Sequence, residues 1–157
     1  MSPVPPLRRE IVVAAAPAVA FDVFTAGIGR WWPLAELSVH RDRSASVAFE
    51  DGVIVERSTA GEEAVWGTVT RWEPPAAVAF SWHPGRPADA AGLVEVTFAA
   101  VDGGTLVTLR HGGWEAYADP AAARADYDRG WPMVLGRYGD EAARGVSPAP
   151  ERPAPRP

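Results

Sequence analysis

The sequence contains three histidines, and these are its best candidates for proton transfer or metal binding near neutral pH. No two of them have the spacing that places a pair of metal ligands on one face of a helix, and the HExxH motif is absent. We therefore expect neither a metal nor another cofactor. His111 shares the alternation of Val107 and Leu109, so its side chain should face the core. There it would be either a buried histidine bonded to the backbone or a polar group in a cavity.

The other candidates for acid–base or nucleophilic chemistry carry weaker signals. His40 follows a pair of tryptophans and belongs either at a cavity mouth or in an exposed loop, whereas His83 is out of phase with Trp82 and should face solvent. Glu62 and Glu63 lie beside a turn and are more typical of a solvated pair than of a catalytic dyad. Lysine, cysteine and the GxSxG motif are absent, which excludes Schiff-base, thiol and serine-elbow chemistry. We assign no catalytic residue and favour a binding protein over an enzyme.

Seven tryptophans form a second group of candidates, because such large rings must be buried or must line a binding site. Trp82 shares the alternation of Phe80 and should face inward, and Trp131 lies on the apolar stripe of the C-terminal segment. Trp31 and Trp32 are adjacent, so on a helix their side chains diverge by about 100°. We expect one of them to contact the sheet and the other to be free to close over a pocket entrance.

Composition limits the class of protein. The chain has 157 residues, of which 47% are hydrophobic and 22% charged, as in one soluble globular domain. Its formal net charge of −5 argues against a nucleic-acid partner, and its apolar runs are too short to span a membrane. Arg8 and Arg9 precede an apolar stretch that imitates a signal peptide, but Glu10 follows them and Pro17 divides that stretch. We therefore expect mature structure there and a cytoplasmic protein.

Periodicity and turn signals predict the elements that would position these residues. Asp51 and Gly52 form the strongest hairpin signal, and Pro120 after the N-cap candidate Asp119 begins the last helix. Within that helix Pro132 predicts a kink or a break into two shorter helices. The expected strands cover residues 7–14, 46–50, 53–59, 64–72, 78–82, 93–100 and 105–111, and the expected helices cover residues 17–28 and 119–144, with a turn or second short helix at residues 31–34.

This order of elements predicts an α+β fold. A curved seven-stranded antiparallel sheet should wrap around the long C-terminal helix, with two short helices between the first and second strands. Side chains could fill the space between sheet and helix or leave it open for a ligand. Prolines are concentrated at both ends of the chain, three in residues 1–6 and five in residues 145–157. We predict disordered tails there and a folded domain over residues 7–144.

Four motifs follow one another along the chain: Trp31-Trp32-Pro33, the stretch from Trp66-Gly67-Thr68-Val69 to Phe80-Ser81-Trp82, the run from Gly104 to His111, and Gly130-Trp131 to Leu135. In this order they resemble the START-like (SRPBCC) helix-grip superfamily. Within it they resemble the branch named for the activator of the ATPase of the 90-kilodalton heat-shock chaperone, over about residues 8–144. The resemblance implies the helix-grip fold, with a deep and largely apolar cavity between the sheet and the terminal helix. The superfamily includes lipid and hormone binders, aromatic polyketide cyclases and many small bacterial proteins.

The resemblance and the inward-facing residues together predict binding of a hydrophobic small molecule, by a carrier or a sensor. Two alternatives stay open. One is a co-chaperone-like interaction module, whose partner would be a chaperone or a second copy of the chain. The other is an enzyme of the cyclase or aromatase kind, in which a shaped pocket folds a reactive chain. The predicted cavity lining consists of Trp32, His40, Trp66, Phe80, Trp82, Val107, Leu109, His111, Tyr127, Trp131 and Leu135.

Overall fold

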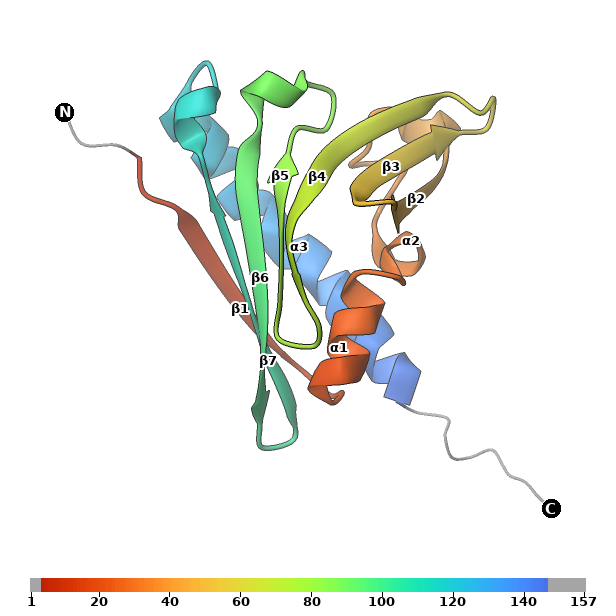
Figure 1. Cartoon of the computed structure of the whole chain (residues 1–157), viewed down its shortest axis with the longest axis vertical. Helices are drawn as coiled ribbons and strands as arrows, with labels where there is room; N and C mark the ends of the chain where they lie inside the picture. The colour runs from red at the N-terminus through yellow and green to blue at the C-terminus, as the bar shows by residue number, and fades with distance from the viewer. Residues whose placement is uncertain (1–3, 147–157) are drawn as a thin grey trace.

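Seven antiparallel strands form one sheet that curves around a long C-terminal helix (Figure 1). The computed structural model describes residues 4–146. The strand order is β1-β7-β6-β5-β4-β3-β2, a meander from β2 to β7 with β1 added beside β7. This arrangement confirms the predicted α+β fold class. The strands are β1 (Leu7–Val13), β2 (Ser44–Glu50), β3 (Val53–Ser58), β4 (Glu63–Glu73), β5 (Ala77–Trp82), β6 (Gly92–Val101) and β7 (Gly104–Gly112).

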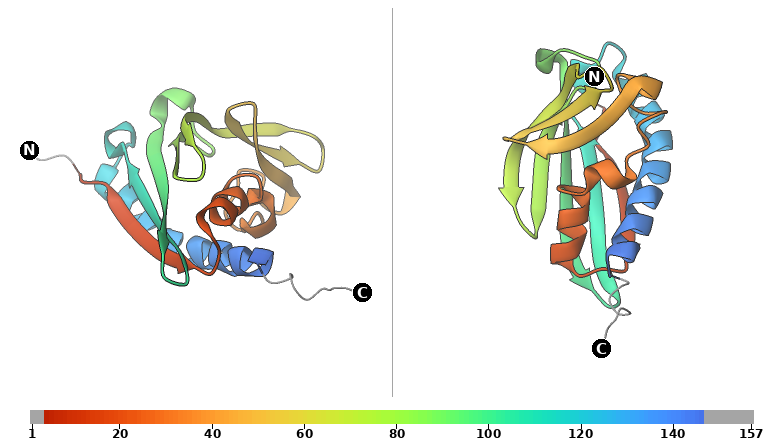
Figure 2. Two further views of the ribbon diagram at one scale, coloured as in Figure 1. Left: turned by 60° about the horizontal axis from the view of Figure 1, so that its bottom comes forward. Right: turned by 90° about the vertical axis from the view of Figure 1, so that its right-hand side faces the viewer.

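Three α-helices and three single 3-10 turns complete the fold over residues 4–146. Figure 2 shows α1 and α2 within the curve of the sheet, beside α3, where they pack on that helix and on β6 and β2 respectively. The predicted tails at residues 1–3 and 147–157 lie outside the described residues, and α3 includes residues 145 and 146. The helices are α1 (Pro17–Phe24), α2 (Ile28–Trp31) and α3 (Pro120–Val146), and the 3-10 turns are η1 (Arg41–Arg43), η2 (Ala88–Ala90) and η3 (Trp114–Ala116).

Local sequence signals explain two features of the sheet. Asp51 and Gly52 both adopt positive φ, 51° and 80°, as a two-residue hairpin between β2 and β3 requires. In β4, Gly67 pairs with Ile54 at the point where the pairing with β3 shifts register. A Cβ at Gly67 would lie 1.8 Å from the carbonyl oxygen of Ser81, so only glycine allows the two backbones to approach this closely.

The predicted helix over residues 17–28 is in fact two helices. The α1 helix ends at Phe24, and the Thr25 hydroxyl donates a hydrogen bond to the carbonyl oxygen of Phe21 at 2.8 Å. The α2 helix ends at Trp31 because Pro33 disfavours helical geometry at Trp32, which is extended with ψ of 131°. Trp31 is therefore helical and Trp32 extended, and the side chains of both are buried.

The α3 helix runs without a break through Pro132, so the alternative of two shorter helices is wrong. Proline at this position cannot donate the usual hydrogen bond to the carbonyl oxygen of Asp128, four residues earlier. Arg9 on β1 supplies a donor instead: its Nη2 lies 2.9 Å from that oxygen, while its Nε lies 3.0 Å from the Asp128 carboxylate. A contact from the sheet therefore satisfies the helix carbonyl that Pro132 leaves free.

The prediction that His83 faces solvent is also wrong. His83 is only 5% exposed, because the chain turns back after β5 and closes over the ring. Its backbone N–H donates to the carbonyl oxygen of Trp66 at 2.6 Å, and its Nδ1 lies 3.0 Å from the carbonyl oxygen of Arg86. The strand alternation stops at this turn, so the phase of Trp82 does not extend to the next residue.

Candidate functional site

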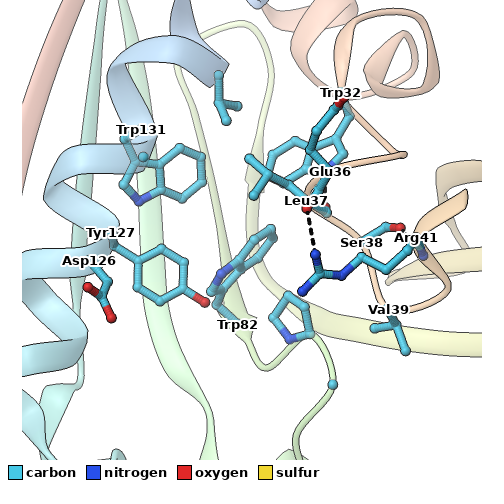
Figure 3. A pocket seen from close by; sticks show the side chains of 14 residues that line it. Trp32, Glu36, Leu37, Ser38, Val39, Arg41, Trp82, Asp126, Tyr127 and Trp131 are labelled. Carbon is cyan, nitrogen blue, oxygen red and sulfur yellow. Dashed lines mark hydrogen bonds between the residues drawn. The ribbon is translucent and has the colours of Figure 1, made fainter.

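A cavity of about 580 Å³ lies between α3, the turn after β5 and the loop that follows α2 (Figure 3). Its inner wall is aromatic, and its mouth is formed by exposed residues of the loop and of α3. A volume of this size is typical of small-molecule sites in proteins. The lining residues are Trp32, Glu36, Leu37, Ser38, Val39, Arg41, Trp82, Pro84, Gly85, Asp126, Tyr127, Gly130, Trp131 and Val134.

One face of α3 supplies a wall of the cavity. Tyr127, Gly130, Trp131 and Val134 are spaced at i, i+3, i+4 and i+7, which places them on the same side of a helix. Hydrogen bonds to other elements at several points along its length hold the helix in this orientation. One of them joins the Tyr138 hydroxyl to the carbonyl oxygen of Ala20 at 2.7 Å. The face that lines the cavity is thus fixed by contacts outside it.

Three tryptophans from three different segments meet at the inner end of the cavity. The ring centroid of Trp32 lies 5.7 Å from that of Trp82 and 6.0 Å from that of Trp131, and the last two rings are 5.8 Å apart. Tyr127 stacks on Trp131 with centroids 6.4 Å apart. These tilted and edge contacts are favourable arrangements for aromatic rings. They leave flat apolar surface against which a ligand ring could pack.

His111 supports this wall from behind. It is fully buried, and its Nδ1 accepts a hydrogen bond from the Trp131 indole at 3.1 Å, so the ring proton belongs on Nε2. Nε2 lies 3.4 Å from the Tyr117 hydroxyl. Burial holds the pKa of His111 at about 3, well below the 6.5 of a free histidine, so the ring is neutral at physiological pH. A neutral ring keeps the acceptor that orients Trp131.

The loop that forms the opposite wall is held by a buried carboxylate. Glu56 on β3 is fully buried, and its side chain accepts hydrogen bonds from the backbone N–H of Val39 at 2.8 Å and of His40 at 2.9 Å. It also accepts one from the Trp66 indole at 2.9 Å. Burial alone would raise the pKa of Glu56, but these hydrogen bonds together lower it by more. The net pKa is therefore below that of an ordinary glutamate, and the group is ionised at neutral pH.

Charged side chains surround the mouth. Arg41 has a positive φ of 54°, and its Nη1 donates to the carbonyl oxygen of Glu36 at 3.3 Å, as the dashed line in Figure 3 shows. The backbone N–H of Arg41 donates to the Ser38 hydroxyl at 2.8 Å, which stabilises the turn. Asp126 forms an ion pair with Arg129 on the same helix. The mouth is therefore polar, whereas the inner end is apolar.

The structure places four of the predicted lining residues on this cavity: Trp32, Trp82, Tyr127 and Trp131. The others lie in the core around it, without lining it. His40 is half-buried and contributes its backbone N–H to Glu56. The remaining residues of this second group, all buried, are Trp66, Phe80, Val107, Leu109, His111 and Leu135.

From the loop wall, sequence reasoning named only His40, and it missed the carboxylate that holds this loop. Gly130 and Val134 could have been found from helical spacing, since they share the face of Trp131. Residues 36–41 carry no periodic signal, and their place depends on a carboxylate in a different element. Glu56 itself follows Ile54 at a strand spacing of two, which would have indicated an inward carboxylate.

Two further observations concern metal sites and membranes. Among residues 4–146, no three histidine, aspartate or glutamate side chains gather closely enough to hold a metal ion. None of the helices in that range combines the length and apolar character needed to cross a bilayer.

Comparisons with known proteins agree with the fold. No curated protein sequence matches the chain. Among solved structures, the anthrahydroquino-γ-pyrone synthase Txn09 is 28% identical, with a TM-score of 0.58, and the match covers 89% of this chain and 99% of that one. The self-sacrificing resistance protein CalC from Micromonospora echinospora is 22% identical, with a TM-score of 0.62, and the match covers 92% of this chain and 97% of that one.

A third structure, protein CV1439 from Chromobacterium violaceum, is 14% identical, with a TM-score of 0.64, and covers 89% of this chain and 99% of its own. At this identity the likeness concerns the fold alone. The family model described as activator of Hsp90 ATPase homolog 1-like protein matches residues 14–137. That match spans most of the chain and confirms the START-like resemblance seen in its motifs, so the protein belongs to the activator of Hsp90 ATPase homolog 1-like family.

Proposed function

We propose that the protein binds a hydrophobic small molecule in this cavity, as a carrier or a sensor. The observation that carries the proposal is the combination of volume and lining: about 580 Å³ bounded by the rings of Trp32, Trp82, Tyr127 and Trp131. Binding would remove apolar surface of both ligand and rings from water, which is the main driving force for such sites. The polar mouth lets a ligand enter through residues that water already solvates.

The test blocks the cavity without disturbing the core. Gly130 lies on the cavity wall, and a Cβ placed there meets no atom within 4 Å. The substitution Gly130→Leu therefore introduces a bulky side chain on the cavity side of α3, and leucine favours the helix over glycine by about 1 kcal/mol. We expect an unchanged or raised melting temperature together with at least a tenfold loss of affinity for 1-aminoanthracene, measured by calorimetric titration.

Gly136→Leu is the matched control. Gly136 lies on the same helix, is exposed, does not line the cavity, and a Cβ there also meets no atom within 4 Å. This variant should gain the same helix stability and bind the probe as the wild type does. If the wild type shows no saturable binding, or if Gly130→Leu binds as tightly as Gly136→Leu, the cavity is not the ligand site.

A cyclase-type enzyme is the second candidate, and the 28% identity with the synthase favours it. Proton transfer in such an enzyme would gain from a histidine or tyrosine side chain paired with a carboxylate. Within residues 4–146 the side-chain partners of His111 are an indole and a phenol, and no tyrosine hydroxyl bonds an acidic residue. These contacts support binding more than acid–base catalysis.

Native mass spectrometry of the purified protein would identify a co-purified ligand. It would thereby distinguish a ligand carrier from the co-chaperone-like interaction module, which needs no ligand in the cavity.

A further inference from the structure

The inner end of the cavity contains one polar group without a partner. Trp82 is 2% exposed, and its indole N–H makes no hydrogen bond within the described part of the chain. Burying a donor without an acceptor is costly, and most buried N–H groups in proteins are paired. A lining residue with an unpaired donor indicates that the acceptor is supplied by what enters the cavity.

The other two tryptophans of the wall differ from Trp82 in this respect. The Trp32 indole donates to the carbonyl oxygen of Leu37 at 2.6 Å, and the Trp131 indole donates to His111 Nδ1 at 3.1 Å. Both N–H groups are therefore used within the protein. These residues offer a ligand only their ring surfaces, so hydrogen bonding to a tryptophan in this cavity is concentrated at Trp82.

Tyr127 adds a second donor at the same place. In Figure 3 its hydroxyl points toward the edge of the Trp82 ring that carries the nitrogen. Burial raises the pKa of Tyr127 by more than the adjacent Trp82 indole and Tyr117 hydroxyl lower it, so the hydroxyl stays protonated and able to donate at neutral pH. An oxygen placed between these two groups could accept from both, because a carbonyl oxygen has two lone pairs and an indole N–H can only donate.

On the basis of the proposed function, we infer that the ligand is a planar aromatic ketone or quinone whose carbonyl oxygen accepts hydrogen bonds from the Trp82 indole and the Tyr127 hydroxyl. Its rings would pack against Trp32 and Trp131, whose own polar atoms are satisfied. A hydrocarbon of the same shape would fit the rings but leave the Trp82 donor unpaired. Selectivity for the carbonyl is therefore the property that distinguishes this inference from general hydrophobic binding.

The test compares 9-fluorenone with fluorene, which have the same three fused rings and differ in a carbonyl against a methylene group. Since a neutral hydrogen bond contributes about 0.5–1.5 kcal/mol, the wild type should bind fluorenone about three- to tenfold more tightly than fluorene. In Tyr127→Phe and in Trp82→Phe this preference should fall toward unity. Trp72→Phe is the matched control for Trp82→Phe, because Trp72 is 52% exposed on β4 and does not line the cavity. This control should keep the preference.

The outcomes separate the two levels of the proposal. If neither compound binds the wild type, hydrophobic binding in the cavity itself is refuted. If both bind equally well, or if Tyr127→Phe and Trp82→Phe keep the full preference, the cavity binds aromatic molecules but the carbonyl inference is overturned. Because Tyr127→Phe removes a single half-buried hydroxyl, its melting temperature should match that of the wild type. The Tyr127→Phe arm therefore decides the question even if Trp82→Phe is unstable.

Discussion

His111 makes the stability of this protein depend on pH in a way that can be calculated. The folded protein keeps the ring neutral down to about pH 3, whereas the unfolded chain binds a proton there below about pH 6.5. As pH falls through this range the unfolded state takes up a proton that the folded state does not, so folding stability is lost. The slope is about 1.4 kcal/mol per pH unit once the unfolded histidine is mostly charged.

Between pH 7 and pH 5 the expected loss from His111 alone is about 2 kcal/mol. This value does not depend on the folded pKa, as long as that pKa stays below about 4. The titratable side chains that face His111 are Tyr117 and Tyr127, and burial raises the pKa of both, so they stay uncharged in this range. The lowered pKa of Glu56 acts mainly below pH 4.5, outside the window.

The assay is urea unfolding of the wild type and of His111→Gln at pH 7, 6 and 5. Glutamine cannot titrate, but its amide oxygen can still accept the hydrogen bond from Trp131. The variant will be less stable than the wild type at pH 7, and the gap should narrow by about 2 kcal/mol on going to pH 5. The remaining ionisable groups are common to both proteins and cancel in the difference. Parallel losses in the two proteins would refute a buried, neutral His111.

Three further predictions concern contacts outside the aromatic wall. Glu56→Gln should lower the free energy of unfolding by about 2 kcal/mol at pH 7, because hydrogen bonds to a charged acceptor are lost. In urea unfolding the difference in stability between wild type and variant should shrink below pH 4.5. A difference that stays constant with pH would contradict an ionised Glu56. Arg9→Met should lower the free energy of unfolding by about 1 kcal/mol, because the Asp128 carbonyl oxygen then has no donor. Arg8→Met, a control on the same strand, should lower it by almost nothing, and equal losses in urea unfolding would show that the Arg9 contact does not stabilise α3. We also propose that residues 147–157, five of them proline, add nothing beyond about 0.5 kcal/mol, so truncation after Val146 should leave the thermal melt unchanged, and a loss of ten degrees would contradict this.

Strands and the long helix could be predicted because their signals are local. Alternation along β5 and β6 follows directly from the apolar residues that face the core, and Pro120 marks the start of α3 as proline in a first helical turn does. The continuity of α3 at Pro132 could not be predicted in this way. Arg9, more than a hundred residues away in sequence, donates to the carbonyl oxygen that Pro132 leaves free, and local rules for proline take no account of such a partner.

The candidate site was predictable only on its aromatic side. Periodicity identifies Trp82 and Trp131 as inward-facing, and Pro33 accounts for the position of Trp32 once the end of α2 is known. The loop wall has no periodicity of its own. It is fixed by backbone N–H groups that bind the Glu56 carboxylate, an interaction that involves no side chain of Val39 and so leaves no trace in its residue type.

The three tryptophans of the wall also show why residue type does not determine the chemistry of a site. All three are buried, and each could line a cavity or fill a core. Their difference lies in the acceptors around them: a loop carbonyl for Trp32, a histidine nitrogen for Trp131 and no protein acceptor for Trp82. Substitutions to phenylalanine should accordingly have unequal effects. At Trp32 and Trp131 they would remove contacts that position the wall, whereas at Trp82 they would remove a donor that the folded protein itself does not use.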